Sequence, residues 1–246
     1  MSVIRQVGDF SFCFFNRNGG VSSDSFCSLN CSFNQLDKKE NVLQNRKIVK
    51  QKFSVNKEII LVNQVHSNKV VFVDKSFDGS KVYADAMITD RKDILLGILT
   101  ADCAPIVVIS KKKFAIIHAG WKGVFSGIIE NTIKELYKRG ENIKDMQFFV
   151  GPHLKKKSFE IKDDFIQIMR KKTSNYLIYI SKRKNKKFFD FSCMIEDILQ
   201  KQNVKSIEIS NEDTFTNSKK FFSYRFYIKK GIKNCGRQIT LVGIKD

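Results

Sequence analysis

Three side chains that can bind a metal or carry a proton stand out in this chain: His66 in NQVHS, Cys103 in TADCAP and His118 in HAGWKG. Two imidazoles and one thiolate are a good ligand set for zinc, and copper also accepts them. Three protein ligands leave one position open for water or substrate, as in catalytic zinc sites. The pattern predicts a catalytic metal site at His66, Cys103 and His118, with zinc expected and copper as the alternative.

Each of these residues also has a simpler interpretation. A single cysteine in an apolar run is commonly a small buried hydrophobe, and His66 alone would be read as a surface or capping histidine. Asp102 is harder to explain in this way, because a carboxylate in an apolar run must be paired or hydrogen-bonded, and such groups cluster at functional sites. We expect Asp102 either to orient a ligand histidine or to transfer a proton. Asp102, Cys103 and His118 are therefore the candidate catalytic residues.

The elements that must position these side chains are mostly strands. Apolar patterns predict strands at 58–66 and 69–74, one buried strand at 94–110 with Asp102 and Cys103 inside it, and a strand at 111–121 that includes His118. Further strands are expected in 10–22 and 147–153, and two strands around a turn in 221–244.

Helical patterns cover 37–53, 124–140 and 192–202. Asp37 and Glu40 resemble a capping box at the start of the first helix. Strands outnumber helices and do not alternate with them cleanly, which favours an α+β layered domain over a doubly wound one. We find no Gly/Ser linker and no repeat, so one domain is expected over residues 1–246.

Composition limits the function classes further. The formal net charge is +19 and would suit a nucleic-acid-binding protein. Lysine greatly exceeds arginine, however, and arginine is the residue suited to bidentate phosphate and guanine contacts. We therefore attribute the positive charge of the chain to a lysine-rich proteome and expect no nucleic-acid partner. The N-terminal MSVIRQVGDF has no apolar signal core and no apolar run has membrane-spanning length. We expect a cytoplasmic protein with reduced cysteines and no membrane partner.

The motifs NQVHS, TADCAP, HAGWKG, VGPHL with SFEI, and FFSYR with CGR resemble, in this order, those of the laccase-domain family. This family is also called the multicopper polyphenol oxidase or peptidoglycan editing factor family and includes bacterial purine nucleoside phosphorylases. GGVS, SLN and NR extend the resemblance through Asn30 and Arg46, so it covers nearly the whole chain. The resemblance implies a single layered, αββα-like domain with mixed β-sheets flanked by helices. It also implies a metal at the positions of His66, Cys103 and His118.

For function, the resemblance implies phosphorolysis of inosine, adenosine and methylthioadenosine, with adenosine deamination as a second activity. The partners would be purine nucleosides and phosphate, and we expect a monomer. Substrate binding falls to the matching positions Asn30, Arg46, Gln64, Lys122 and Arg225, of which Arg46 and Lys122 would position phosphate. The alternative is a Cys–His hydrolase that edits peptidoglycan precursors, with Cys103 as nucleophile and His118 as base. Three histidines are too few for a multicopper cluster, which argues against laccase activity.

Four positions depart from the family pattern. Lys122 stands where arginine is common, and Phe226 where a second arginine is usual. His153 stands where the family has a cysteine or a small residue, and Asp213 where cysteine is frequent. These changes put the mode of anion binding in doubt rather than the ligand set, and they leave His153 and Asp213 without a role.

Overall fold

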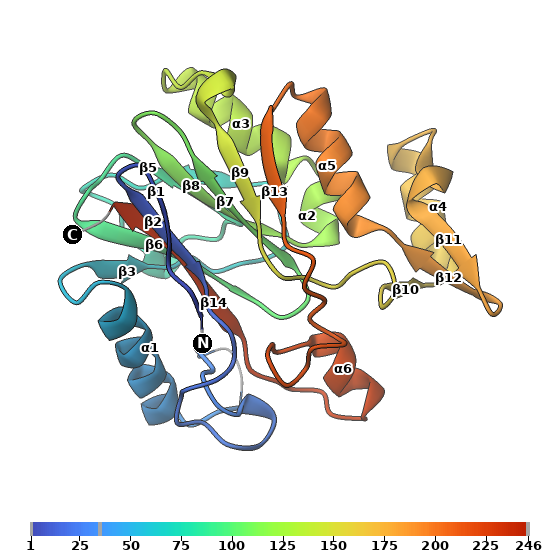
Figure 1. Cartoon of the computed structure of the whole chain (residues 1–246), viewed down its shortest axis with the longest axis horizontal. Coiled ribbons are helices and arrows are strands. Elements are labelled where there is room, and N and C mark those ends of the chain that lie inside the picture. The colour runs from blue at the N-terminus through green and yellow to red at the C-terminus, as the bar shows by residue number, and fades with distance from the viewer. Residues whose placement is uncertain (1, 34–35, 245–246) are drawn as a thin grey trace.

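Two β-sheets lie face to face at the centre of the computed structural model, which describes residues 2–33 and 36–244 (Figure 1). One sheet has the strand order β1-β2-β14-β6-β3 and the other β13-β9-β7-β8-β5-β4. The strands of the five-stranded sheet are β1 (Arg5–Val7), β2 (Phe10–Phe14), β3 (Glu58–Ile60), β6 (Ile94–Thr100) and β14 (Gln238–Ile244). Those of the six-stranded sheet are β4 (Val70–Phe72), β5 (Ala86–Thr89), β7 (Ala104–Ile109), β8 (Phe114–Ala119), β9 (Gln147–Val150) and β13 (Ser206–Ile209). Both sheets are mixed, because β3 pairs with β6 in parallel, as β4 does with β5 and β13 with β9.

The side chains of β7 show why the layers form. Val107 and Ile109 point into the core between the two sheets, whereas Ile106 and Val108 point to the opposite face. Successive strand residues face opposite sides of a sheet, so an uninterrupted apolar run suits a strand covered on both faces. The six-stranded sheet is therefore an inner layer.

Helices cover the outer faces of both sheets (Figure 1). The helices are α1 (Lys39–Phe53), α2 (Trp121–Phe125), α3 (Ile128–Lys138), α4 (Asp163–Lys172), α5 (Phe191–Lys201) and α6 (Tyr224–Lys229). α1 packs Val49 against Leu95 and Leu241 of the five-stranded sheet, and α3 and α5 cover the six-stranded sheet. The order helix, sheet, sheet, helix confirms the predicted α+β fold with mixed sheets flanked by helices. Within the described ranges, no helix is both long and apolar enough to cross a membrane.

A small third sheet lies to one side of the layers, on the right in Figure 1. It pairs β10 (Glu160–Ile161), β12 (Lys186–Phe189) and β11 (Ile180–Arg183), and α4 accompanies it. Phe165 and Phe189 join it to Trp121 and Phe125 of α2 through a cluster of ring contacts. The sequence patterns did not predict these elements. The described chain also contains the 3₁₀ helices Asp24–Phe26, Gly79–Lys81, Ile143–Asp145 and Tyr176–Tyr179.

The single buried strand predicted over 94–110 is wrong. It is two strands, β6 and β7, which belong to different sheets. Between them Asp102 has a φ of 91°, in the left-handed region that breaks a strand. Its carboxylate accepts hydrogen bonds from Thr214 Oγ1 and the backbone N of Arg225, both at 2.6 Å. Both partners are far from Asp102 in the sequence, so no local pattern predicts the break between the two strands that they stabilise.

Two further expectations need correction. The strand expected before the turn in 221–244 is the helix α6, because Ser223 Oγ accepts a hydrogen bond from the backbone N of Phe226 and caps it. Only β14 forms a strand there. The expected capping box of α1 is absent as well. Lys38 precedes the helix, and the Asp37 carboxylate instead accepts from Ser22 Oγ and Asn30 Nδ2.

Candidate active site

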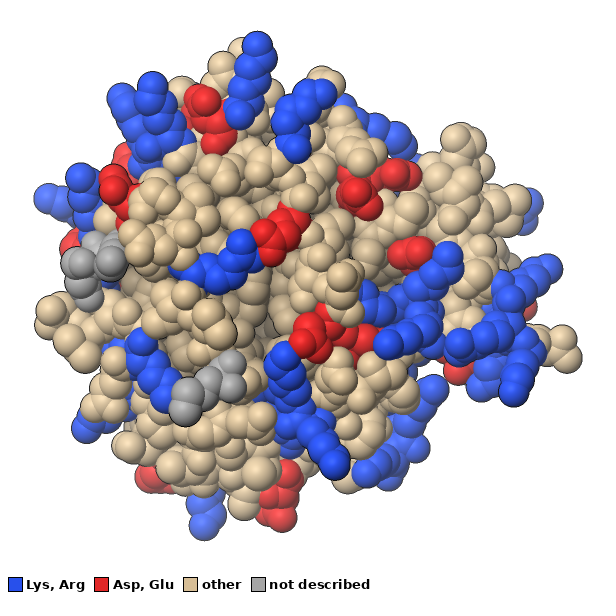
Figure 2. All heavy atoms as spheres, viewed as in Figure 1, with Lys and Arg blue, Asp and Glu red and all other residues tan. Residues whose placement is uncertain are grey.

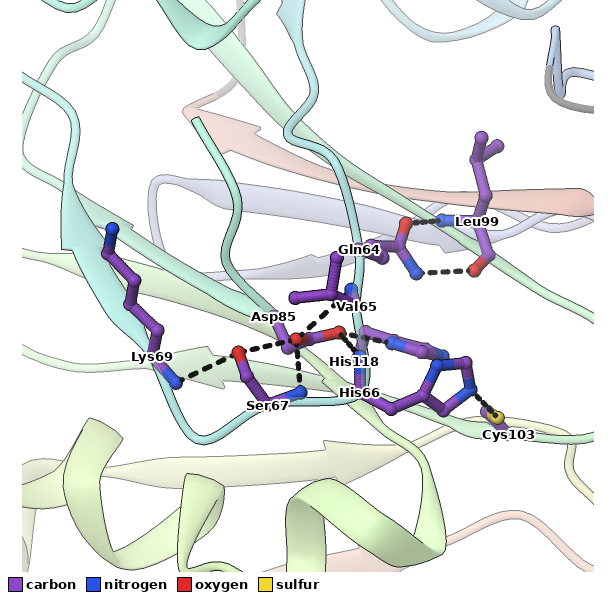
Figure 3. A network of polar contacts seen from close by, with 9 residues as sticks. All are labelled: Gln64, Val65, His66, Ser67, Lys69, Asp85, Leu99, Cys103 and His118. Atoms are coloured by element: carbon purple, nitrogen blue, oxygen red, sulfur yellow. Dashed lines mark hydrogen bonds and ion pairs between the residues drawn. The ribbon is translucent and has the colours of Figure 1, made fainter. Parts of the chain in front are cut away.

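The three candidate ligands meet where the two sheets adjoin (Figure 3). His66 lies in the loop from β3 to β4, Cys103 in the link from β6 to β7, and His118 near the end of β8. Their ligand atoms all lie within 4.8 Å of one another. His66 Nε2 is 3.7 Å from Cys103 Sγ, and the two imidazole centroids are 4.8 Å apart. The structure thus brings together the residues that the sequence grouped as ligands.

Asp85 holds two of these ligands in place. Its Oδ1 lies 2.8 Å from His118 Nδ1 and accepts from the backbone N of His66 at 3.0 Å. Its Oδ2 accepts from Ser67 N at 2.6 Å and Ser67 Oγ at 2.7 Å. Because a carboxylate accepts the Nδ1 proton, His118 keeps Nε2 free to face Cys103 and His66. The same contacts support His66, whose φ of 59° is strained for a residue other than glycine.

The charges of the site reinforce one another. Burial raises the pKa of Asp85, but hydrogen bonds from His118 and Ser67 outweigh it and lower that pKa to about 2. Burial also raises the pKa of the Cys103 thiol, but His118 and His66 outweigh this effect and the pKa falls below its ordinary value. The pKa of His118 is raised in turn, because the charges and contacts of Cys103 and Asp85 exceed the opposing effect of burial. The site therefore favours a thiolate, which is the form that binds metals and attacks electrophiles.

The glycines of HAGWKG allow the chain to close around the site. A Cβ atom on Gly120 would lie 2.6 Å from His66 Cδ2 and 3.3 Å from Cys103 Sγ. A Cβ on Gly123 would lie 2.8 Å from the carbonyl O of Ser67. The contacts at 2.6 and 2.8 Å are too short for a side chain, so glycine is required at both positions for α2 to begin this close to the His66 loop.

Asp102 does not orient a histidine in this structure, in contrast to one of the two roles expected for it. The carboxylate that accepts from His118 Nδ1 is that of Asp85, whereas the Asp102 carboxylate accepts from Thr214 and from the start of α6. Burial raises the pKa of Asp102, and it lines the same cavity as Cys103. Its role in proton transfer stays a prediction. Asp85 was missed, although its place in the apolar stretch ADAMIT gave the same signal that singled out Asp102.

A cavity of about 720 Å³ opens over the three ligand side chains. This volume is within the usual range for small-molecule sites. Aromatic rings and cations both contribute to its walls, namely Trp121, Phe159, Phe191, Tyr224, Lys122, Arg225 and Arg237. The cavity can therefore hold a flat apolar group and an anion together.

Of the predicted substrate-binding residues, Gln64, Lys122 and Arg225 line this cavity. The Gln64 amide is already engaged, since it donates to the carbonyl O of Leu99 and accepts from its backbone N, both at 2.8 Å (Figure 3). Arg225 donates to the carbonyl O of Glu160 at 2.9 Å. Lys122 is exposed, with its Nζ 5.6 Å from the centroid of the Trp121 ring, and is the more available of the two cations.

Asn30 and Arg46 do not line the cavity. Asn30 is fully buried and its Oδ1 accepts from the backbone N of Arg237 at 2.9 Å. Arg46 donates to the carbonyl O of Cys31 at 2.9 Å and packs over Phe33. Direct substrate contact was expected of both, but Asn30 reaches the cavity through two lining residues, Arg237 and Ser32, to which it is hydrogen-bonded. Arg237 lines the cavity but was not among the predicted substrate-binding residues, although it lies in the CGR motif.

Known proteins resemble this chain over most of its length. Residues 11–245 match the family described as multi-copper polyphenol oxidoreductase laccase. A purine nucleoside phosphorylase of Rickettsia conorii is 30% identical over 222 residues, covering 89% of each chain. One from Aquifex aeolicus is 33% identical over 184 residues, covering 74% of this chain and 84% of that protein.

Two further similarities concern a second activity and the fold. An adenosine deaminase from an unknown prokaryotic organism is 27% identical over 124 residues, which is 46% of this chain and 47% of that protein. The crystal structure of a Neisseria meningitidis protein superposes with a TM-score of 0.88 at 25% identity, covering 100% of this chain and 99% of that one.

Proposed function

Because this chain belongs to the multi-copper polyphenol oxidoreductase laccase family, we propose that it is a metal-dependent purine nucleoside phosphorylase. Its substrates are inosine, adenosine and methylthioadenosine together with phosphate, and adenosine deamination is a second activity. The observation that carries the proposal is the convergence of His66, Cys103 and His118 in one cavity that also presents cations and aromatic rings. The names of the relatives from Rickettsia and Aquifex support the phosphorylase activity, and that of the deaminase supports the second one.

The donor set fits a metal ion. His66, Cys103 and His118 would hold it, because Asp85 occupies Nδ1 of His118 and the lowered pKa of Cys103 favours the thiolate. Zinc is the expected metal and copper the alternative, since both accept imidazole and thiolate. When bound, zinc supplies a Lewis acid close to the substrate.

The residues of this chain would divide the remaining work. Lys122, with Arg225 and Arg237, balances the charge of phosphate as it attacks C1′ of the ribose and the bond from C1′ to the purine breaks. Trp121 and Phe159 offer apolar rings to the base. In deamination, water replaces the amino group at C6 and ammonia leaves. Asp102, with its raised pKa, is the candidate proton carrier.

One arrangement favours a second candidate, a Cys–His hydrolase acting on peptidoglycan precursors. His118 lies between the Cys103 thiol and the Asp85 carboxylate, which is the order of a nucleophile, a base and an orienting acid. A thiolate ligated to a metal is not free to attack. Tightly bound stoichiometric metal therefore favours the phosphorylase, and its absence favours the hydrolase.

The test combines metal analysis of the purified protein with a purine-release assay on inosine, adenosine and methylthioadenosine, each with and without phosphate. We expect about one metal per chain and base release that requires phosphate. Ammonia release from adenosine, measured without phosphate, reports the second activity. A metal-free protein that releases no purine under any of these conditions contradicts the proposal.

A further inference from the structure

A second cavity of about 560 Å³ lies beside the first. None of its lining residues also lines the Cys103 cavity. The two share a thin wall, since Leu154 and Phe191 face the first cavity while their chain neighbours Lys155 and Ser192 face the second. The wall consists of the segment after β9 and the first turn of α5.

The second cavity is predominantly basic. Its charged lining residues are Lys155, Lys156, Lys157, Arg183, Asp190 and Glu196, so positive side chains outnumber negative ones by four to two. Figure 2 shows Lys and Arg side chains gathered on the same side of the molecule as the three-stranded sheet.

A buried hydrogen-bonded chain lies behind this lining. His153 is fully buried, and its Nδ1 is 2.8 Å from the carbonyl O of Gly151. A carbonyl can only accept, so Nδ1 carries the proton and Nε2 is an acceptor. Ser192 Oγ, at 2.9 Å, donates to that Nε2, and Lys155 Nζ donates to Ser192 Oγ at 3.0 Å. Burial, and then the charge of Lys155, lower the pKa of His153 to about 3. His153 is therefore neutral, and both hydrogen-bond partners of Lys155, His153 and Ser192, are uncharged.

The positive charge of Lys155 therefore has no carboxylate in direct contact within the described part of the chain, and Asp190 and Asp213 act on it only from a greater distance. Among the residues that the structure describes, no carboxylate forms an ion pair with its Nζ. The nearby Asp190 instead pairs with Lys156 at 3.2 Å and accepts from the backbone N of Cys193 at 3.1 Å. Burial lowers the pKa of Lys155 to about 8, because the charges of Asp190 and Asp213 offset the cost of burial only in part. Lys155 has three N–H donors, of which Ser192 and His153 take two.

We propose that the second cavity binds a tetrahedral oxyanion, either inorganic phosphate or the phosphate group of a monoester, with Lys155 as its inner ligand. Ser192 and His153 position the ammonium group from behind. Lys157 and Arg183 supply charge nearer the mouth, where Arg183 Nη2 donates to the carbonyl O of Lys157 at 3.2 Å. This site is separate from the phosphate position of the proposed reaction and does not depend on that reaction.

The test is trace acetylation of the full chain with acetic anhydride near pH 8, read for each lysine by mass spectrometry. Inorganic phosphate is raised while sodium chloride keeps the ionic strength constant. We expect phosphate to lower the acetylation of Lys155 at least about fivefold, because one charge-assisted hydrogen bond from its ammonium group to the anion would protect the amine. Lys182, which is exposed on β11 and does not line the cavity, should be unchanged. Acetylation of Lys155 that ignores phosphate overturns the proposal.

Variants separate this site from the catalytic one. Arg183→Gln should raise the phosphate concentration for half-protection of Lys155 about tenfold, whereas the adjacent Lys182→Gln should leave it unchanged. Lys122→Ala, in the Cys103 cavity, should also leave it unchanged, so the outcome is independent of phosphorolysis. Equal effects of Arg183→Gln and Lys182→Gln would indicate that general surface charge attracts the phosphate, and this would overturn the proposed site. A glucose 6-phosphate titration under the same conditions shows whether a monoester replaces free phosphate.

Discussion

His118 and His153 are both buried, and each has Nδ1 bonded to an oxygen at 2.8 Å, yet their pKa values shift in opposite directions. The charge of the Cys103 thiolate beside the ring, together with the Asp85 carboxylate at Nδ1, raises the pKa of His118 despite its burial. The Nδ1 partner of His153 is a neutral carbonyl, and its nearest charge is Lys155, so burial prevails and the pKa falls to about 3. Burial thus penalises charge in both places, and the sign of the neighbouring charge decides the outcome. One site is suited to a cation and the other to an anion.

The largest expected effect is a loss of both activities in a variant of the first site. Cys103→Ala removes a candidate ligand from the first site, and we expect both phosphorolysis and deamination to fall by a factor on the order of 10³ or more. Cys193→Ala, a thiol on α5 outside both cavities, should change either rate less than about threefold. Rates are measured with and without phosphate, together with metal content. Full activity of Cys103→Ala would remove this residue from the reaction.

The next effect tests why His118 differs from His153. Asp85→Asn replaces the carboxylate at Nδ1 with a neutral amide, as at His153. We expect metal affinity and activity to fall about 10- to 100-fold, as for other residues that orient a metal-binding histidine. Asp213→Asn is the matched control, since Asp213 is equally buried but accepts from Ser158 Oγ away from the Cys103 cavity. Metal content after dialysis against a chelator series measures the affinity. Similar losses in both variants would show that Asp85 acts only through stability.

A third prediction concerns the anion in the first cavity. Lys122→Ala should raise the KM for phosphate about ten- to a hundredfold, because one charge-assisted contact contributes about 1.5–3 kcal/mol. Deamination involves no phosphate and should be spared. Lys134→Ala, on α3, is the control and should leave both activities unchanged. An unaltered KM for phosphate in Lys122→Ala would place this lysine outside the site, and equal loss of both activities would indicate a structural role.

The smallest effect is the pH dependence of stability at His153. Its pKa is about 3 in the folded protein and about 6.5 in an unfolded chain, so the unfolded state binds the proton first as pH falls. Stability is complete above about pH 6.5 and is lost progressively towards pH 3. Between pH 7 and 5.5 the loss is about 1 kcal/mol, and His153→Gln should lack this part of it. Urea unfolding of both proteins at the two pH values measures the difference. An identical pH dependence would contradict the lowered pKa.

The convergence of His66, Cys103 and His118 and the layered α+β fold could be predicted, because these three are unusual residue types in apolar segments and the family motifs span the chain. That the three residues bind a metal stays a prediction. The sequence could not distinguish Asp85 from Asp102. Both are carboxylates in apolar stretches, and only the packing of β5 beside β8 brings Asp85 to His118. The break at Asp102 depends on Thr214, 112 residues away. A single domain, a monomer, a cytoplasmic location and the absence of nucleic-acid partners stay predictions.

The three candidate ligands come from segments that belong to both sheets, because Cys103 lies on the link from β6 to β7 and His66 follows β3. Any ligand that contacts all three side chains is held only while the two layers remain packed. Its binding free energy is therefore added to the free energy of separating them. Occupancy would make the two sheets unfold as a single cooperative unit, with a midpoint that rises with the logarithm of ligand concentration. The thermal unfolding midpoint of the protein would then report directly whether a ligand occupies the site formed by these three side chains.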